Sequence, residues 1–101
     1  MTKARIELQK EQLTQFCRKN GIKTLSLFGS VLSDDFGPDS DIDVLVEFKP
    51  GTRIGLIGLT RLEFELSEIF GRKVDLNTPG FISSYFRADV MSEREVQYVE
   101  A

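Results

Sequence analysis

The chain has 101 residues, a formal net charge of −3 and no histidine; 41% of its residues are hydrophobic and 29% are charged. These proportions are ordinary for a globular protein, and the length predicts a single domain over residues 1–101. The absence of histidine excludes Ser-His-Asp triads, Cys-His pairs and His-ligated zinc, while a lone cysteine excludes an internal disulfide. Any metal site must therefore use oxygen ligands, which favour hard cations such as magnesium, manganese or calcium.

Charge and hydropathy exclude two further classes of protein. The net charge is negative, whereas proteins that bind nucleic acid over much of their surface are positively charged there. We therefore expect no general nucleic-acid binding. No apolar run approaches the ~20 residues of a membrane span. Residues 1–10 mix acidic and basic side chains with no apolar block behind them, unlike a signal peptide. We therefore expect a cytoplasmic protein with no membrane partner.

The first half of the chain predicts two strands preceded by a helix. Apolar residues recur at helical spacing before Gly21, which is a typical helix stop. Alternating apolar and polar side chains then mark the second strand. In chain order, the sequence predicts a helix over 3–20, a strand over 22–28, a helical turn over 30–35, a loop over 36–40 and a strand over 41–48.

The second half predicts two helices and one or two short strands. The clearest helical periodicity ends before Gly71, again a helix stop. In chain order we expect a helix over 59–70, a strand over 74–76, a helix over 81–91 and a strand over 95–99, with a helical tail as the alternative for the last segment. Strands that alternate with helices predict a small α/β sandwich in which helices cover one sheet.

Asp41 and Asp43 are the first candidates for chemistry. Two positions apart on a strand, they project from one face with backbones about 6.6–7 Å apart. Such a pair can bracket two metal ions ~3.5–4 Å apart. Without a cation, two carboxylates at ~5 Å repel by about 3 kcal/mol at an effective dielectric of ~20. The alternative is that one wet face of an antiparallel strand carries both acids without any function.

The surrounding segment strengthens the metal interpretation. Residues 34–47 contain six acidic residues and no Lys or Arg, so the segment needs either solvent or a bound cation. An EF-hand loop starting at Asp39 would place Val44 where glycine is required and Pro50 where a bidentate Glu is required. A calcium loop of that type is therefore excluded.

Gly29, Ser30 and Asp75 complete the candidate set. A glycine at a strand end lets the backbone approach a ligand closely, and a serine that begins a helical turn can offer its hydroxyl and nearby N–H groups to a phosphate. The alternative is an ordinary turn with Ser30 as its cap. Asp75 lies between two apolar residues of a short strand, where a simple edge or turn acid is the alternative.

Taken together, these residues resemble a known pattern. Leu27-Phe28-Gly29-Ser30, ten further residues and then Asp41-Ile42-Asp43, followed by Asp75 on a later strand, look like the signature of DNA polymerase beta-like nucleotidyltransferases. The stretch over 38–48 is especially similar to the minimal nucleotidyltransferase (MNT) family, whose members often pair with HEPN proteins in toxin–antitoxin systems. The resemblance implies an α/β (α+β) nucleotidyltransferase-like sandwich, with a mixed sheet of three to four strands and helices packed mainly on one face.

The resemblance also implies a role for each candidate residue. Asp41 and Asp43 would each ligate both of two Mg²⁺ ions, for which Mn²⁺ can substitute. Asp75 would complete one metal site and help to deprotonate the acceptor. Gly29 and Ser30 would hold the triphosphate of ATP, the donor. The implied function is an antitoxin that transfers AMP to a hydroxyl, a tyrosine by resemblance, on a HEPN partner.

One departure from the pattern leaves alternatives open. Many relatives carry a basic residue shortly after the Gly-Ser pair, whereas residues 31–35 here contain none. Arg72 or Lys73, just before Asp75, could compensate, or could simply be exposed at a strand entry. The alternatives are a subunit that neutralises a HEPN partner by binding alone, and a transferase with a small-molecule acceptor. A homo-oligomer is also compatible with the sequence.

Overall fold

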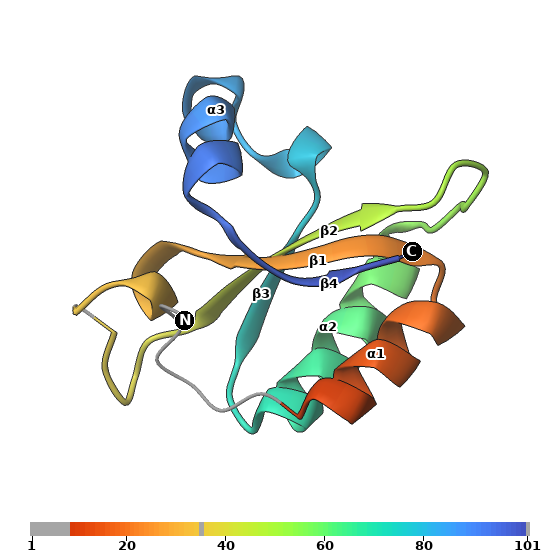
Figure 1. Ribbon diagram of the computed structural model, residues 1–101, viewed down its shortest axis with the longest axis horizontal. Helices are drawn as coiled ribbons and strands as arrows, with labels where there is room; N and C mark the ends of the chain where they lie inside the picture. The colour runs from red at the N-terminus through yellow and green to blue at the C-terminus, as the bar shows by residue number, and fades with distance from the viewer. Residues whose placement is uncertain (1–8, 35, 101) are drawn as a thin grey trace.

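The computed structural model describes residues 9–34 and 36–100 (Figure 1). Two short 3₁₀ helices, η1 (Gly29–Leu32) and η2 (Pro79–Phe81), accompany the longer elements. In chain order these are α1 (Lys10–Lys19), β1 (Ile22–Phe28), β2 (Ile42–Phe48), α2 (Leu56–Phe70), β3 (Val74–Asn77), α3 (Ser84–Glu93) and β4 (Glu95–Val99).

The four strands form one mixed sheet in the order β3-β2-β1-β4. β1 pairs antiparallel with both β2 and β4, whereas β2 pairs parallel with β3. The crossover between the two parallel strands is made by α2, as a parallel connection requires. This arrangement confirms the expected mixed sheet, and β4 confirms the strand expected over 95–99.

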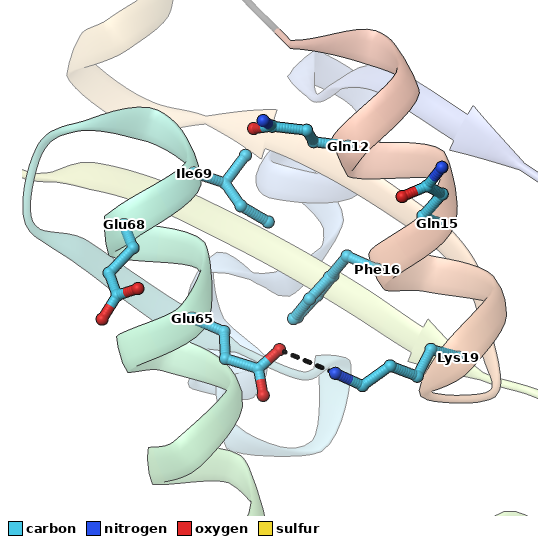
Figure 2. A pocket seen from close by; sticks show the side chains of 7 residues that line it. All are labelled: Gln12, Gln15, Phe16, Lys19, Glu65, Glu68 and Ile69. Carbon is cyan, nitrogen blue, oxygen red and sulfur yellow. Dashed lines mark ion pairs between the residues drawn. The ribbon is translucent and has the colours of Figure 1, made fainter.

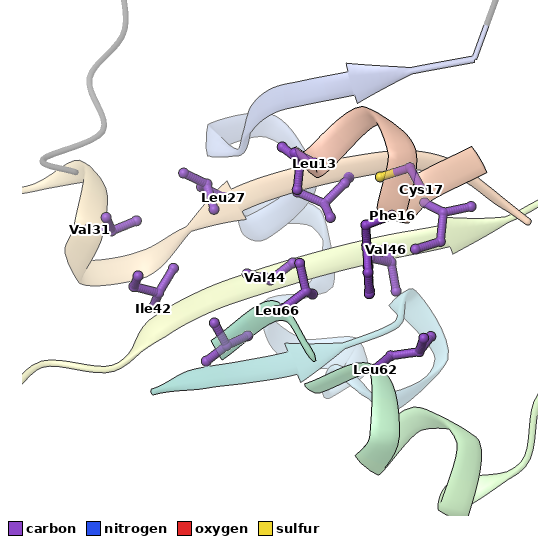
Figure 3. Close-up of a cluster of buried hydrophobic side chains, with 13 residues drawn as sticks. Leu13, Phe16, Cys17, Leu27, Val31, Ile42, Val44, Val46, Leu62 and Leu66 are labelled. Carbon is purple, nitrogen blue, oxygen red and sulfur yellow. The ribbon is translucent and has the colours of Figure 1, made fainter. Parts of the chain in front are cut away.

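Helices α1 and α2 lie side by side over one face of the sheet and close the hydrophobic core against it (Figure 1). The apolar stripe of α1 buries Leu13, Phe16 and Cys17, and that of α2 buries Leu62 and Leu66. Figure 3 shows these side chains meeting the inward-facing residues of β1 and β2. The helix-covered face is therefore the core of the molecule.

Helix α3 stands on the opposite side of the sheet from α1 and α2 (Figure 1) and buries none of its residues. The sequence predicts a helix over 81–91, but the structure begins α3 at Ser84. The reason is Ser83, whose hydroxyl accepts a hydrogen bond from the backbone N–H of Tyr85 at 3.3 Å and so caps the helix one turn later. Phe81, Tyr85 and Phe86 are left exposed.

Other boundaries also differ from the expectation, and β2 begins at Ile42, which leaves Asp41 just before the strand on which it was expected. Helix α1 begins at Lys10, where the carbonyl of Gln9 accepts the N–H of Leu13, and residues 3–8 of the expected helix lie outside the described residues. The expected turn over 30–35 is the 3₁₀ helix η1, which ends at Leu32. Helix α2 begins at Leu56, directly after Gly55. No helix within 9–34 or 36–100 is long and apolar enough to cross a membrane.

Candidate functional site

The register of two strands brings Asp43 and Asp75 together. β2 and β3 run parallel with Asp43 directly opposite Asp75, although 31 other residues separate them in sequence. Their neighbours Ile42, Val44 and Val74 are buried in the core. Because successive side chains of a strand point to opposite faces, both carboxylates lie on the face away from α1 and α2. Sequence alone placed both residues on strands but could not align them.

Asp43 is the electrostatic centre of this face. Burial raises the pKa of the Asp43 carboxyl to about 6, and the negative charges of Asp75 and Asp41 and a side-chain hydrogen bond with Asp75 add to the increase. The three carboxyls differ in exposure, since Asp75 is exposed whereas Asp41 and Asp43 are half-buried. Asp43 therefore interacts with both other candidate acids. The negative charges of the three carboxylates repel one another, and a divalent cation would relieve this repulsion.

The end of β1 approaches the same carboxylate. Phe28, the last residue of β1, pairs with Asp43, and Gly29 follows with a positive φ of 75°. A Cβ atom at Gly29 would lie well inside contact distance of Asp43 Oδ2. Both the backbone conformation and the lack of a side chain are thus required here, as a close approach of backbone to a ligand site demands.

Ser30 lies next to Gly29 within η1, which packs against β1 and β2. The Ser30 carbonyl accepts hydrogen bonds from the Ser33 N–H at 2.9 Å and the Ser33 hydroxyl at 3.0 Å. These bonds close the 3₁₀ turn and hold Ser30 at the rim of the acidic face. The structure therefore brings four of the five candidate residues, Gly29, Ser30, Asp43 and Asp75, to neighbouring strand ends, and Asp41 precedes β2 directly.

Arg72 holds the loop that leads into the acids. Its Nη2 donates to the carbonyls of Gly37, Pro38 and Ser40 at 2.5, 2.9 and 2.9 Å. The guanidinium also lies over the Phe36 ring, 4.2 Å from its centroid. In this structure the Arg72 guanidinium therefore restrains the loop through backbone carbonyls and an aromatic face. The sequence carries no local signal of this role, because the loop and Arg72 are more than thirty residues apart.

Lys73 faces the acids instead. Its Nζ lies 3.9 Å from Asp41 Oδ2, and the lysine side chain is 79% exposed. The Lys73 carbonyl accepts the N–H of Ile42 at 2.9 Å, which ties the beginnings of β2 and β3 together. Of the two basic residues singled out in the sequence, Lys73 is thus the one whose charge lies beside an acid of the candidate site.

The chemistry of the three candidate ligands, Asp41, Asp43 and Asp75, suits a hard divalent cation. All candidate ligands are carboxylates, the type that magnesium and manganese prefer. Among the described residues, no three acidic or cysteine side chains already converge as a metal-binding group. The approach is pairwise, with Asp43 interacting separately with Asp41 and Asp75. The residues present suit a magnesium site, although the side chains do not form a ready-made cage.

A groove on the other side of the sheet is not part of this site. It lies between α1 and α2, where an ion pair between Lys19 and Glu65 at 3.6 Å bridges the two helices next to Phe16 (Figure 2). Because α1 and α2 cover the core face, the sheet separates this groove from Asp43 and Asp75. The candidate acids therefore lie on the opposite face from this groove.

Comparison with known proteins defines the class. Residues 9–96 match the family model described as Nucleotidyltransferase domain. The chain is 36% identical over 84 residues to the Methanocaldococcus jannaschii protein named "Putative protein adenylyltransferase MJ0435", covering 83% of this chain and 88% of that protein. The chain belongs to the nucleotidyltransferase domain family, which confirms the resemblance drawn from Gly29-Ser30 and Asp41-x-Asp43.

Two solved structures share the fold. One is described as a crystal structure of a toxin-antitoxin with AMP-PNP; it has 21% sequence identity and a TM-score of 0.74, over 92% of this chain and 75% of the other. A second is a tri-AMPylated Shewanella oneidensis HEPN toxin in complex with an MNT antitoxin, at 20% identity and a TM-score of 0.66, over 90% of this chain and 70% of the other. Both likenesses confirm the nucleotidyltransferase-like sandwich.

Proposed function

We propose that this chain transfers AMP from ATP to a hydroxyl on a HEPN-type protein partner, and so acts as the antitoxin of a toxin–antitoxin pair. The observation that carries the proposal is the meeting of Asp43, Asp75 and the side-chain-free Gly29 at adjacent strand ends. The M. jannaschii relative is named as a protein adenylyltransferase, which supports the reaction. The HEPN toxin complexed with an MNT antitoxin is AMPylated, which supports the partner.

The acids would hold the metal ions of the reaction. Asp41 and Asp43 would each ligate both of two Mg²⁺ ions, and Asp75 would complete one of the two sites. Bound magnesium would supply charge stabilisation for the transition state and the leaving pyrophosphate. The half-burial of Asp43 limits access of water to the centre of the set, which strengthens electrostatic interactions there.

Each bond in the proposed transfer is accounted for. The acceptor hydroxyl oxygen attacks the α-phosphorus of ATP, the bond from that phosphorus to the bridging β-phosphate oxygen breaks, and pyrophosphate leaves. Asp75, the most exposed of the three acids, receives the hydroxyl proton. Gly29 lets the backbone approach the triphosphate, and Ser30 donates its hydroxyl to a phosphate oxygen.

The acceptor belongs to a partner because the acidic face is open. Helix α3 stands on this side of the sheet, but it buries none of its residues, and Asp75 is exposed in the part of the chain that the structure describes. A docked protein would exclude water from the acids and position its own hydroxyl. We place this reaction in the cytoplasm, where ATP and magnesium are abundant.

Intact-mass measurement tests the proposal. The chain is incubated with a candidate HEPN-type partner, ATP and Mg²⁺, and both proteins are weighed. We expect the partner to gain one or more AMP units, and Asp43→Asn to abolish the gain while the complex still forms. Glu68→Gln, which neutralises an exposed carboxylate on the core-side helix α2, is the matched control and leaves the gain intact.

Two outcomes contradict the proposal. If the partner stays unmodified with wild-type protein and Asp43→Asn still neutralises the toxin, neutralisation is by binding alone. If a small-molecule hydroxyl compound is modified in place of the partner, the reaction is retained but the acceptor class is wrong.

A further inference from the structure

Strand β3 is an edge strand whose outer side is occupied by side chains of α2. Among the described strands it pairs with β2 alone, so within residues 9–34 and 36–100 the N–H groups that point away from β2 have no strand partner. The Val74 N–H instead donates to Ser67 Oγ at 3.0 Å, and the Leu76 N–H donates to Glu63 Oε2 at 2.8 Å. Side chains of α2 thus replace the missing strand.

The two helix residues are linked to one another. Glu63 and Ser67 are four positions apart on α2, so they lie on one helix face. The Ser67 hydroxyl donates to the Glu63 backbone carbonyl at 2.8 Å, which leaves its oxygen free to accept from Val74. Glu63 contributes a charged acceptor, and hydrogen bonds of that kind are about twice as strong as neutral ones.

Asp75 lies between the two residues whose backbone N–H groups donate hydrogen bonds to α2. Val74 and Leu76 are its immediate neighbours, and their side chains pack in or against the core while Asp75 points to the acidic face. β3 has only four residues, and its ladder with β2 sets Asp75 opposite Asp43. The bonds from α2 hold the other side of the same short backbone, so they add to the ladder in restraining the Asp75 carboxylate.

We infer that Glu63 and Ser67 are positioning residues for Asp75, acting through the backbone of β3 without touching substrate. The inference rests on the proposed function in one respect, namely that Asp75 is a metal ligand. Groups that orient a metal ligand commonly change metal affinity or activity by about 10–100-fold when they are removed. A purely structural role, holding α2 against the sheet, would lower stability without changing affinity in the folded protein.

The experiment combines two measurements on the metal-binding protein without a partner. Amide hydrogen exchange at Leu76 and Val74 reports the two bonds, and titration with Mn²⁺ reports the ligand geometry. We expect Glu63→Ala to accelerate exchange at Leu76 and to weaken Mn²⁺ binding about 10–100-fold. Glu63→Gln keeps an acceptor oxygen and restores most of the affinity. Glu68→Ala, an exposed carboxylate on the same helix, leaves both readouts at wild-type values.

Ser67→Ala is the second variant and guards against failure of Glu63→Ala to fold. It removes one hydroxyl, and we expect faster exchange at Val74 with an affinity loss in the same direction. Unchanged Mn²⁺ affinity in folded Glu63→Ala and Ser67→Ala, despite faster exchange, overturns the inference and leaves the metal site intact. Unchanged exchange shows that the bonds do not form in solution and overturns it as well. Wild-type protein that binds no Mn²⁺ refutes the proposed metal site itself.

Discussion

The two faces of the sheet use the same strands for opposite purposes. On one face α1 and α2 bury Leu, Ile and Val side chains of β1 and β2 completely. On the other, Asp43 of β2 lies opposite Asp75 of β3, and burial together with the charges of Asp75 and Asp41 raises the pKa of Asp43. Adjacent residues such as Ile42 and Asp43 point to opposite sides of the sheet, so the pleat of the strand separates the hydrophobic core from the acidic face.

The largest expected effect on stability comes from removing volume from the core face. Leu66 of α2 is fully buried, and Leu66→Ala should lower the free energy of unfolding by about 2–5 kcal/mol. Phe64→Ala, two positions away on the same helix, should change it by less than about 0.5 kcal/mol because Phe64 is 70% exposed. Urea unfolding measures both. Equal losses would mean that the helix face assignment is wrong.

Substitution of Gly29 should disturb the acidic face, because its backbone lies close to the Asp43 carboxylate. Gly29→Ala forces an alanine into the left-handed region, at about 1–2 kcal/mol, and also pushes a Cβ against the carboxylate. Gly51→Ala has a similar positive φ of 86° but no atom within 4 Å of its Cβ. We expect both variants to melt at lower temperature, but only Gly29→Ala to lose Mn²⁺ affinity. Loss of affinity in both would show a general effect of backbone strain.

Neutralising Asp43 should stabilise the metal-free protein, whereas loss of a core side chain destabilises it. The pKa of Asp43 is raised to about 6 in the folded protein, so the unfolded chain binds fewer protons than the folded chain between pH 4 and 6. Stability from this group is complete below about pH 4 and is lost as pH rises through 6. Asp43→Asn should therefore gain about 1–2 kcal/mol at pH 7, and the gain should vanish near pH 4.

Thermal melts in chelator across this pH range check the sign. Added Mn²⁺ should reverse the order at pH 7, because a bound ion stabilises only the wild-type protein. A variant that is less stable than wild type in chelator at pH 7 would show that Asp43 makes a favourable structural contact instead.

The smallest expected effect separates the two basic neighbours Arg72 and Lys73. Arg72→Ala removes three bonds to the loop carbonyls and should cost about 1 kcal/mol, with faster amide exchange over residues 37–40. Lys73→Ala removes an exposed pair with Asp41 and should cost less than about 0.5 kcal/mol. If Lys73→Ala accelerated exchange over residues 37–40 more than Arg72→Ala does, the role of Arg72 in holding this loop would be wrong.

The local elements and the family could be predicted from the sequence. Apolar periodicity indicated all four strands and three helices, although capping at Ser83 moved the beginning of α3. The spacing from Gly29-Ser30 to Asp41-x-Asp43 was specific because both motifs lie on, or next to, adjacent strands. Such patterns are visible in sequence since a side chain's face follows from its position along one strand or helix.

Contacts between residues far apart in the chain could not be predicted in this way, because they depend on how the strands and helices pack. The parallel register puts Asp75 opposite Asp43. It also brings the Arg72 guanidinium against a loop that lies more than thirty residues earlier in the chain. The same packing puts Glu63 beside the free edge of β3. A lone acid or arginine carries no local signal of its partner, because pairing depends on strand register and helix placement, which arise only when the whole core closes.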